Sequence, residues 1–220
     1  MFSTSVEDYI KHIYELQSEG SKVNTSSLAL KLNVSPASVS EMISKLTKPG
    51  WIENTPYRGF SLTDKGEKIA VNLIRKHRLI EVFLHQHLGY SWDEVHVEAE
   101  KFEHVCTDKF INKLDEYLGY PKSDPHGDPI PDINGNIADK KNLMLCDSEP
   151  RRYYIVRKVN DTSDEVLRYI SGIGIKLNTE VFLSEKITFD ESILITINGV
   201  KHLLSKRIAE NIFVEEKIIR

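Results

Sequence analysis

Apolar residues recur with the 3.6-residue period of an α-helix through the first half of the chain. This spacing predicts a helix over residues 5–19, with Ser5 as its N-cap and Asp8 completing a capping box. The same period predicts two long helices, one over residues 64–88 and one over residues 92–118. The N-terminal half of the protein is therefore expected to be largely helical.

A helix-turn-helix pattern lies between the first helix and the long helices. Thr25 or Ser26 caps a short helix, a tight turn follows, and a second helix is predicted over residues 36–48 with proline in its first turn. Two strand-like segments at 51–54 and 60–63 then form a hairpin wing. The second helix of such a pair typically enters the major groove of DNA, although similar helical cores also serve protein contacts.

The pattern changes to period two near Arg151, after a loop-rich stretch over residues 119–152 that contains prolines and glycines. The predicted strands are 153–159, 180–184, 193–199 and 212–214, and the predicted helices among them are 163–171 and 201–209. Several short strands within about 70 residues favour a small, partly closed barrel.

These elements predict three domains and a fold class that is mainly α with a small β domain. Residues 1–73 are expected to form a winged helix-turn-helix, residues 74–141 a helical dimerisation domain, and residues 142–220 a connector and the β domain. The two long helices carry more apolar surface than they need internally, which suggests a homodimer.

Composition and charge narrow the class of protein. Of the 220 residues, 40% are hydrophobic and 28% charged, and the net charge of −4 argues against coating nucleic acid through bulk positive charge. Local basic patches stay compatible with this charge. No apolar run approaches the roughly 18 residues that cross a bilayer, and Cys106 and Cys146 form no disulfide framework or CxxC motif. We expect a cytoplasmic protein without a membrane partner.

Several potential metal ligands crowd residues 96–104. Glu100, Glu103 and His104 share one face of the predicted helix, and His96 lies one turn earlier. Carboxylates held between apolar positions repel one another, so this face either is solvated, with its charges paired to lysines, or binds a cation.

A second set of potential ligands lies on either side of this stretch. His77 and Glu81 are spaced i, i+4 on the preceding helix, and Asp124 and His126 lie in the proline-rich loop. An isolated histidine is usually a core or surface imidazole, and such loop residues commonly form turns. The alternative to these ordinary structural roles is that the residues form a metal site.

The exposed face of the predicted second helix of the helix-turn-helix carries small polar and basic side chains that can approach DNA closely. The residues expected to face bases are Ser35, Pro36, Ala37, Ser38, Ser40 and Glu41, and those expected at phosphates are Lys45, Lys48 and, at the tip of the wing, Arg58.

This order of a winged helix-turn-helix, the helical segments RKHRLIEVFL and HVEAEKFEH, and a small β domain resembles the DtxR/MntR family of metal-dependent transcriptional repressors. The resemblance covers essentially the whole chain, and its C-terminal part is similar to the SH3-like FeoA module of the family. It implies a metal site at Asp8, Glu100, Glu103 and His104. Carboxylates stand at Asp8 and Glu100, where iron-sensing members have a methionine and a cysteine, and this substitution is similar to the manganese-responsive branch.

The resemblance also implies a second or adjacent site formed by the remaining ligands. These are His77, Glu81, His96, Asp124 and His126, completed by Asp161 or Asp164 of the β domain. An oxygen-rich set of ligands with imidazole suits Mn(II), with Fe(II) or Zn(II) as substitutes, so one or two Mn(II) ions are expected per subunit.

The expected function is that of a metal-activated repressor of metal-uptake genes, not an enzyme. One Mn(II) ion held by Asp8 and by the central helices would fix the spacing of two recognition helices in a dimer on double-stranded operator DNA. An iron-responsive regulator, a metal-dependent hydrolase and a regulator that senses an organic ligand are the alternatives. The hydrolase is disfavoured because the chain has no HExxH motif and no nucleophile with a positioned base.

Overall fold

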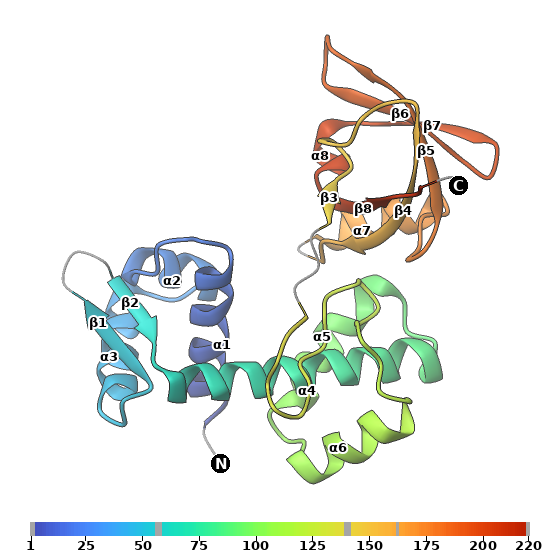
Figure 1. Ribbon diagram of the computed structural model, residues 1–220. Coiled ribbons are helices and arrows are strands. Elements are labelled where there is room, and N and C mark those ends of the chain that lie inside the picture. The colour runs from blue at the N-terminus through green and yellow to red at the C-terminus, as the bar shows by residue number, and fades with distance from the viewer. Residues whose placement is uncertain (1–2, 56–58, 139–141, 162, 219–220) are drawn as a thin grey trace.

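The computed structural model describes residues 3–55, 59–138, 142–161 and 163–218. Its elements form an N-terminal unit, a central helical unit and a C-terminal sheet unit, and the long helix α4 runs from the first into the second (Figure 1). Each unit has its own cluster of buried apolar side chains. The expected fold class, mainly α with a winged helix-turn-helix and a small β domain, is confirmed.

The N-terminal unit packs three helices and a two-stranded hairpin around one core. Its elements are α1 (Thr4–Ser18), α2 (Thr25–Leu32), α3 (Pro36–Thr47), β1 (Ile52–Thr55) and β2 (Gly59–Leu62). Ile10, Leu28 and Leu46 are fully buried there, one from each helix. Gly59 lies so close to the chain before α2 that a Cβ atom would stand 2.1 Å from the Val23 carbonyl oxygen. Only glycine therefore fits where the wing meets that segment.

Two of the expected helix caps are wrong. The helix α1 begins one residue before Ser5, with Ser3 as the N-cap, and α2 is capped by Asn24 rather than by Thr25 or Ser26. The asparagine side chain accepts a hydrogen bond from the backbone of the third helical residue, whose own hydroxyl accepts one in return. This reciprocal pair satisfies two backbone donors that the helix leaves open, so the cap falls one residue earlier than expected.

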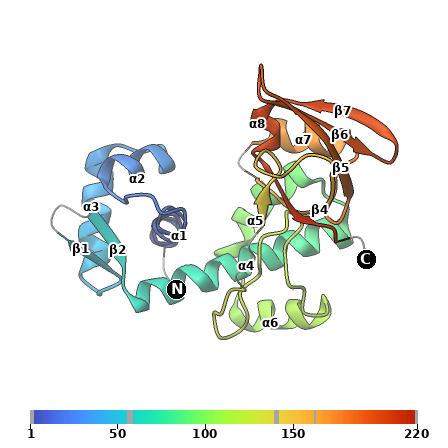
Figure 2. The same cartoon turned by 45° about the horizontal axis from the view of Figure 1, so that its top comes forward.

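The central unit contains three helices rather than two. The helix α4 (Asp64–Leu88) has the expected limits, whereas the predicted helix over 92–118 is two helices, α5 (Trp92–Glu103) and α6 (Asp108–Tyr117). The break occurs because the Thr107 side chain accepts a hydrogen bond from the Phe110 backbone and starts a new helix. Both α5 and α6 pack on α4, and they lie on different sides of it in both views (Figure 2).

The C-terminal unit is one antiparallel sheet with two helices. Its elements are β3 (Leu143–Met144), β4 (Arg152–Val159), α7 (Asp164–Gly172), β5 (Glu180–Ile187), β6 (Ser192–Ile197), β7 (Val200–Leu204), α8 (Lys206–Ala209) and β8 (Ile212–Glu216). The strand order is β3-β8-β4-β5-β6-β7, so β3 and β7 are the edges. Trp92, the first residue of α5, joins the core of this unit, which anchors the sheet to the central helices.

The helix expected over residues 201–209 is wrong in its first half. Residues 200–204 form β7, which pairs with β6 from Ile197↔Val200 onward, and only the four residues of α8 are helical. Asn198 and Gly199 both adopt positive φ angles, 49° and 82°. Two such residues form the tight turn that suits a two-residue β-hairpin, so the chain reverses into a strand.

The described residues contain no helix that combines the length and apolar character needed to cross a membrane. The predicted boundary between residues 73 and 74 falls inside α4, so the first two domains share a helix. The division into domains stays a prediction.

Candidate metal centre

The first group of potential ligands joins the N-terminal and central units. Asp8 projects from α1 and takes no part in the expected capping box, while Glu100 lies on α5 and His104 directly follows that helix. Asp8 Oδ1 lies 3.1 Å from His104 Nε2. One ligand atom from each of the three residues lies within 4.8 Å of the others. We call this set, Asp8, Glu100 and His104, the bridging cluster, because its members come from both units.

Glu7 orients the imidazole of the bridging cluster. Glu7 Oε2 lies 2.6 Å from His104 Nδ1, so the ring can donate its Nδ1 proton to this carboxylate. The Nε2 lone pair then faces Asp8 and is available to a metal ion. The sequence reasoning missed Glu7, although it precedes Asp8 and lies one turn before Lys11 on the same helix.

Glu103 forms an ion pair with a buried lysine. Its side chain is fully buried, and both of its carboxylate oxygens lie 3.0 Å from Lys11 Nζ. Glu103 Oε1 also lies 3.5 Å from His104 Nε2, at the edge of the bridging cluster. The structure thus places Glu103 beside the other three predicted ligands but with a cation already bound to it.

Lys11 is the second residue that the sequence reasoning missed. Its ammonium nitrogen also lies 2.9 Å from Glu100 Oε1 and 3.3 Å from His77 Nδ1. Burial alone would lower the pKa of Lys11, but Glu103 and Glu100 outweigh burial and raise the pKa. Lys11 is therefore charged, and its positive charge lies between the two sets of predicted ligands.

A second group consists of His77 and Glu81 of α4 and His96 of α5. His77 Nε2 lies 3.0 Å from Glu81 Oε1 and 3.1 Å from His96 Nδ1, and His77 Nδ1 contacts Glu103. Burial lowers the pKa of His77, but the carboxylates of Glu81 and Glu103 more than offset it and raise the pKa to about 9. The i, i+4 spacing read from the sequence does place His77 and Glu81 together.

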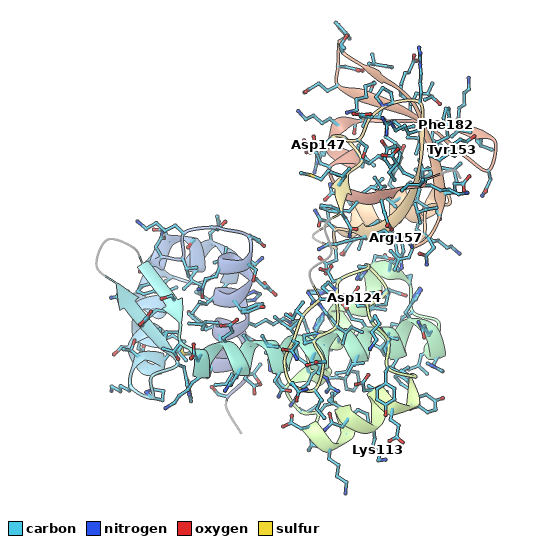
Figure 3. All side chains as sticks on the ribbon, viewed as in Figure 1. Lys113, Asp124, Asp147, Tyr153, Arg157 and Phe182 are labelled. Carbon is cyan, nitrogen blue, oxygen red and sulfur yellow. The ribbon has the colours of Figure 1, made fainter. Side chains whose placement is uncertain are left out.

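A third group contains two residues of the proline-rich loop, which lie close to the Glu81 carboxylate of the second group. One ligand atom each from Glu81, Asp124 and His126 lie within 4.8 Å of one another, and all three residues are buried. Figure 3 labels Asp124 where the central helices meet the sheet unit. Burial and the neighbouring Glu81 carboxylate raise the pKa of Asp124 well above its usual range. Arg78 Nε lies 3.5 Å from Asp124 Oδ2 and already offsets part of that repulsion, and a metal ion would offset more of it.

His126 has an unpartnered nitrogen in this third group. Its Nε2 lies 3.0 Å from the carbonyl oxygen of Trp92, which can only accept, so Nε2 carries the proton. Its Nδ1 is buried and has no hydrogen-bond partner among the described residues. A buried lone pair without a partner is costly, and a metal ion would satisfy it. The residues present therefore fit a metal ion on this side.

Asp161 approaches the second group from the sheet unit. Its Oδ2 lies 3.9 Å from His96 Nδ1. Asp161 follows β4, and the backbone N–H of Val159 at the end of that strand donates to the His126 carbonyl oxygen, so the loop and the sheet hold each other in place. Among the described residues, neither Asp161 nor Asp164 belongs to a group of three potential ligands that lie within 4.8 Å of one another.

The predicted DNA-facing residues form an exposed surface on the N-terminal unit. Ser35 caps α3 and accepts from the backbone N–H of Ser38, and the other predicted residues of α3 are exposed: Pro36, Ala37, Ser38, Ser40, Glu41 and Lys45, with Lys48 directly after the helix. Glu41 pairs with Lys45 at 2.8 Å, so the ammonium group offsets the one acidic charge among these predicted residues. Arg58 lies outside the described residues.

Three family models match successive parts of the chain. Residues 1–60 match the iron dependent repressor, N-terminal DNA binding domain, and residues 63–132 match the iron dependent repressor, metal binding and dimerisation domain. Residues 144–216 match the FeoA domain. The three matches follow the three units of the fold.

Similar proteins and solved structures are repressors of this kind. The chain is 29% identical to the diphtheria toxin repressor of Corynebacterium efficiens, over 96% of this chain and 95% of the relative. It is 36% identical to the HTH-type transcriptional regulator MntR of Oceanobacillus iheyensis, over 56% of this chain and 84% of the relative. A manganese-dependent transcriptional repressor solved in complex with manganese is 36% identical, with a TM-score of 0.89, and the match covers 96% of this chain and all of that one.

The fold and these likenesses define a metal-dependent transcriptional repressor, which is not an enzyme. The chain belongs to the DtxR/MntR family of such repressors, as the sequence motifs indicated. The hydrolase alternative is thereby excluded.

Proposed function

We propose that this repressor responds to Mn(II) and represses metal-uptake genes. The carrying observation is the bridging cluster, in which Asp8 of the DNA-binding unit meets Glu100 and His104 of the central unit within 4.8 Å. Carboxylate oxygens and one imidazole suit Mn(II), and the cluster has no thiolate or thioether that would favour softer ions. One similar solved repressor is described as manganese-dependent and in complex with manganese.

We assign the first site to Asp8, Glu100 and His104, with Glu103 Oε1, which also accepts from Lys11, as a weaker fourth ligand at its edge. A bound divalent cation would add positive charge to that of Lys11 among these carboxylates, and would favour the arrangement in which α1 lies against the end of α5. Glu7 holds the imidazole in the matching tautomer. Metal binding and DNA binding then strengthen each other to the same extent, because both favour the same arrangement of the units.

We assign a second site to the ligands around Glu81. His77 and His96 lie on one side of this carboxylate and Asp124 and His126 on the other, with Asp161 near His96. The unpartnered Nδ1 of His126 supports a metal ion on the loop side. This gives two ions per subunit. The second ion would stabilise the contact between the central helices and the sheet unit, since its ligands come from both.

The partners we propose are double-stranded operator DNA and a second copy of the chain, in the cytoplasm, where a repressor meets its operator. We propose that Lys45, Lys48 and Arg58 contact phosphates and that the bases are contacted by Ser35, Pro36, Ala37, Ser38, Ser40 and Glu41. Exposed apolar side chains on α5, α6 and the turn between them support a homodimer: Val97, Phe102, Val105, Phe110 and Tyr117. A two-fold dimer would place its recognition helices about 34 Å apart, one turn of duplex.

An iron-responsive regulator of the same family is the second candidate. It is favoured by the two family models, whose descriptions name an iron dependent repressor. Zn(II) binds more tightly than Mn(II) to most ligand sets, so geometry and availability must decide among the ions. A gel-shift titration of the protein's own promoter with Mn(II), Fe(II), Zn(II) and EDTA tests the choice. Half-saturation at the lowest concentration by Fe(II) would favour the iron-responsive candidate.

A further inference from the structure

We propose that Lys11 is a built-in cation of the metal centre. Its ammonium group takes the position among His77, Glu100 and Glu103 that a divalent ion would otherwise occupy, and it confines metal ions to the sites on either side. This inference rests on the proposed function, because it concerns the number of ions that the same ligands bind. Lys11 would thereby determine the metal stoichiometry of the repressor.

The three residues around the ammonium group have the arrangement of a metal site. One ligand atom from each of His77, Glu100 and Glu103 lies within 4.8 Å of the others, as in the bridging cluster and around Glu81. Lys11 Nζ lies between them, 2.9 Å from Glu100, 3.0 Å from each oxygen of Glu103 and 3.3 Å from His77 Nδ1. A tethered monocation thus contacts all three would-be ligands.

The position of Lys11 opposes a divalent ion in two ways. The lone pairs of three carboxylate oxygens already accept from the ammonium group, so they cannot be directed fully at another cation. A divalent ion among the same atoms would also lie within a few ångströms of a positive charge in a buried, weakly screened environment. Glu100 keeps its second oxygen, Oε2, for the bridging cluster, so the neighbouring site stays available.

Lys11 also links the two units when metal is absent. It projects from α1, whereas Glu100 and Glu103 belong to α5, and the lysine side chain is only 4% exposed. Breaking such a buried pair leaves carboxylates without a counter-charge, which is strongly destabilising. Replacing Lys11 by a small uncharged residue should therefore create both the space and the electrostatic need for one more cation.

The test compares the Mn(II) content of the full-length wild type, Lys11→Ala and Lys11→Arg after equilibrium dialysis against Mn(II), measured by elemental analysis. Lys11→Arg is the matched control, because it keeps the positive charge at the same position of α1. We expect Lys11→Ala to bind about one more ion per subunit than the wild type, and Lys11→Arg to bind the same number as the wild type. Circular dichroism with and without Mn(II) reports on folding.

The difference between Lys11→Ala and wild type decides the inference, whereas the wild-type content tests the proposed function. A wild type that binds Mn(II) with no gain in folded Lys11→Ala overturns the role of Lys11 and leaves the proposed function intact. If the wild type binds no Mn(II) but Lys11→Ala gains one ion, the role of Lys11 is supported and the proposed function is contradicted. If Lys11→Ala is unfolded in EDTA, saturating Mn(II) should restore its fold, and failure to do so also contradicts the inference.

Discussion

Asp8 Oδ1 lies 3.1 Å from His104 Nε2, although Asp8 belongs to the first helix of the DNA-reading unit and His104 follows a helix of the central unit. Together with Glu100, these residues provide ligands from both units for a divalent cation. The position of the N-terminal unit relative to the rest of the protein therefore depends on whether a metal ion is bound.

Replacing Asp8 by methionine should shift the metal response from Mn(II) towards Fe(II). A thioether is a softer ligand than a carboxylate and removes one negative charge, and Mn(II) gains least from such a ligand. The measurement is a titration of operator binding with each metal. An unchanged preference for Mn(II) would show that Asp8 is not a ligand.

Glu7→Gln should weaken metal-activated operator binding without unfolding the protein. The variant keeps the size of the side chain but replaces the charged acceptor of His104 Nδ1, and the loss of such a partner typically costs about 10- to 100-fold in metal affinity. Glu19→Gln, near the end of the same helix and far from His104, is the matched control. Equal Mn(II) affinities for the two variants would contradict the orienting role of Glu7.

His126→Ala should remove the ion on the loop side of Glu81 and leave the bridging cluster active. The Nδ1 atom of His126 is buried without a hydrogen-bond partner, so the metal-free protein loses no hydrogen bond when this atom is removed. Isothermal titration with Mn(II) should lose one binding event, with His202→Ala on the strand β7 as the control. Two binding events in His126→Ala would rule out His126 as a ligand.

The pairing of Glu15 makes the N-terminal unit sensitive to acid. Burial would raise the pKa of Glu15, but hydrogen bonding to His12 and the charges of His12 and Lys11 lower it from 4.5 to about 2. A lowered folded-state pKa stabilises the protein fully above pH 4.5, and this contribution declines as the pH falls to 2. For this partly screened group the contribution is about 1 kcal/mol.

Urea unfolding of wild type and Glu15→Gln between pH 7 and about pH 3 measures this contribution. The wild type should be more stable above pH 5, and the difference should shrink with acidification. The exposed pair of Glu191 and Lys206 in the sheet unit offers a control, since Glu191→Gln should change stability little at any pH. A difference for Glu15→Gln that is independent of pH would contradict the lowered pKa.

The periodicity of apolar residues, 3.6 in the helices and two in the strands, was enough to predict most of the fold. The limits of α4 and the start of α3 follow from threonine, glycine and proline at these ends and are as expected, whereas α3 ends one residue before the predicted limit at Lys48. The strand β7 was missed because Asn198-Gly199 was read as the end of a strand, whereas its positive φ angles reverse the chain into a hairpin. The break before α6 was missed because Thr107 was not recognised as a helix cap.

The metal centre was predictable only in part, because its geometry depends on contacts between helices far apart in the sequence. Spacing along one helix brings Glu100 and His104 together, but it does not reveal that the Glu103 carboxylate pairs with Lys11 of α1. Lys11 was overlooked because lysine is almost never buried without a partner. Its position one turn after Asp8 and Glu7 was the available signal, since residues three and four apart share a helix face.

The most direct test is a crystal structure of the protein grown with Mn(II), with anomalous diffraction recorded to locate the metal. We predict a manganese peak coordinated by Asp8 together with Glu100 and His104, so that one ion joins α1 to the end of α5. A metal-loaded crystal in which the Asp8 carboxylate coordinates no ion, with manganese bound only to residues of the central and sheet units, would contradict it.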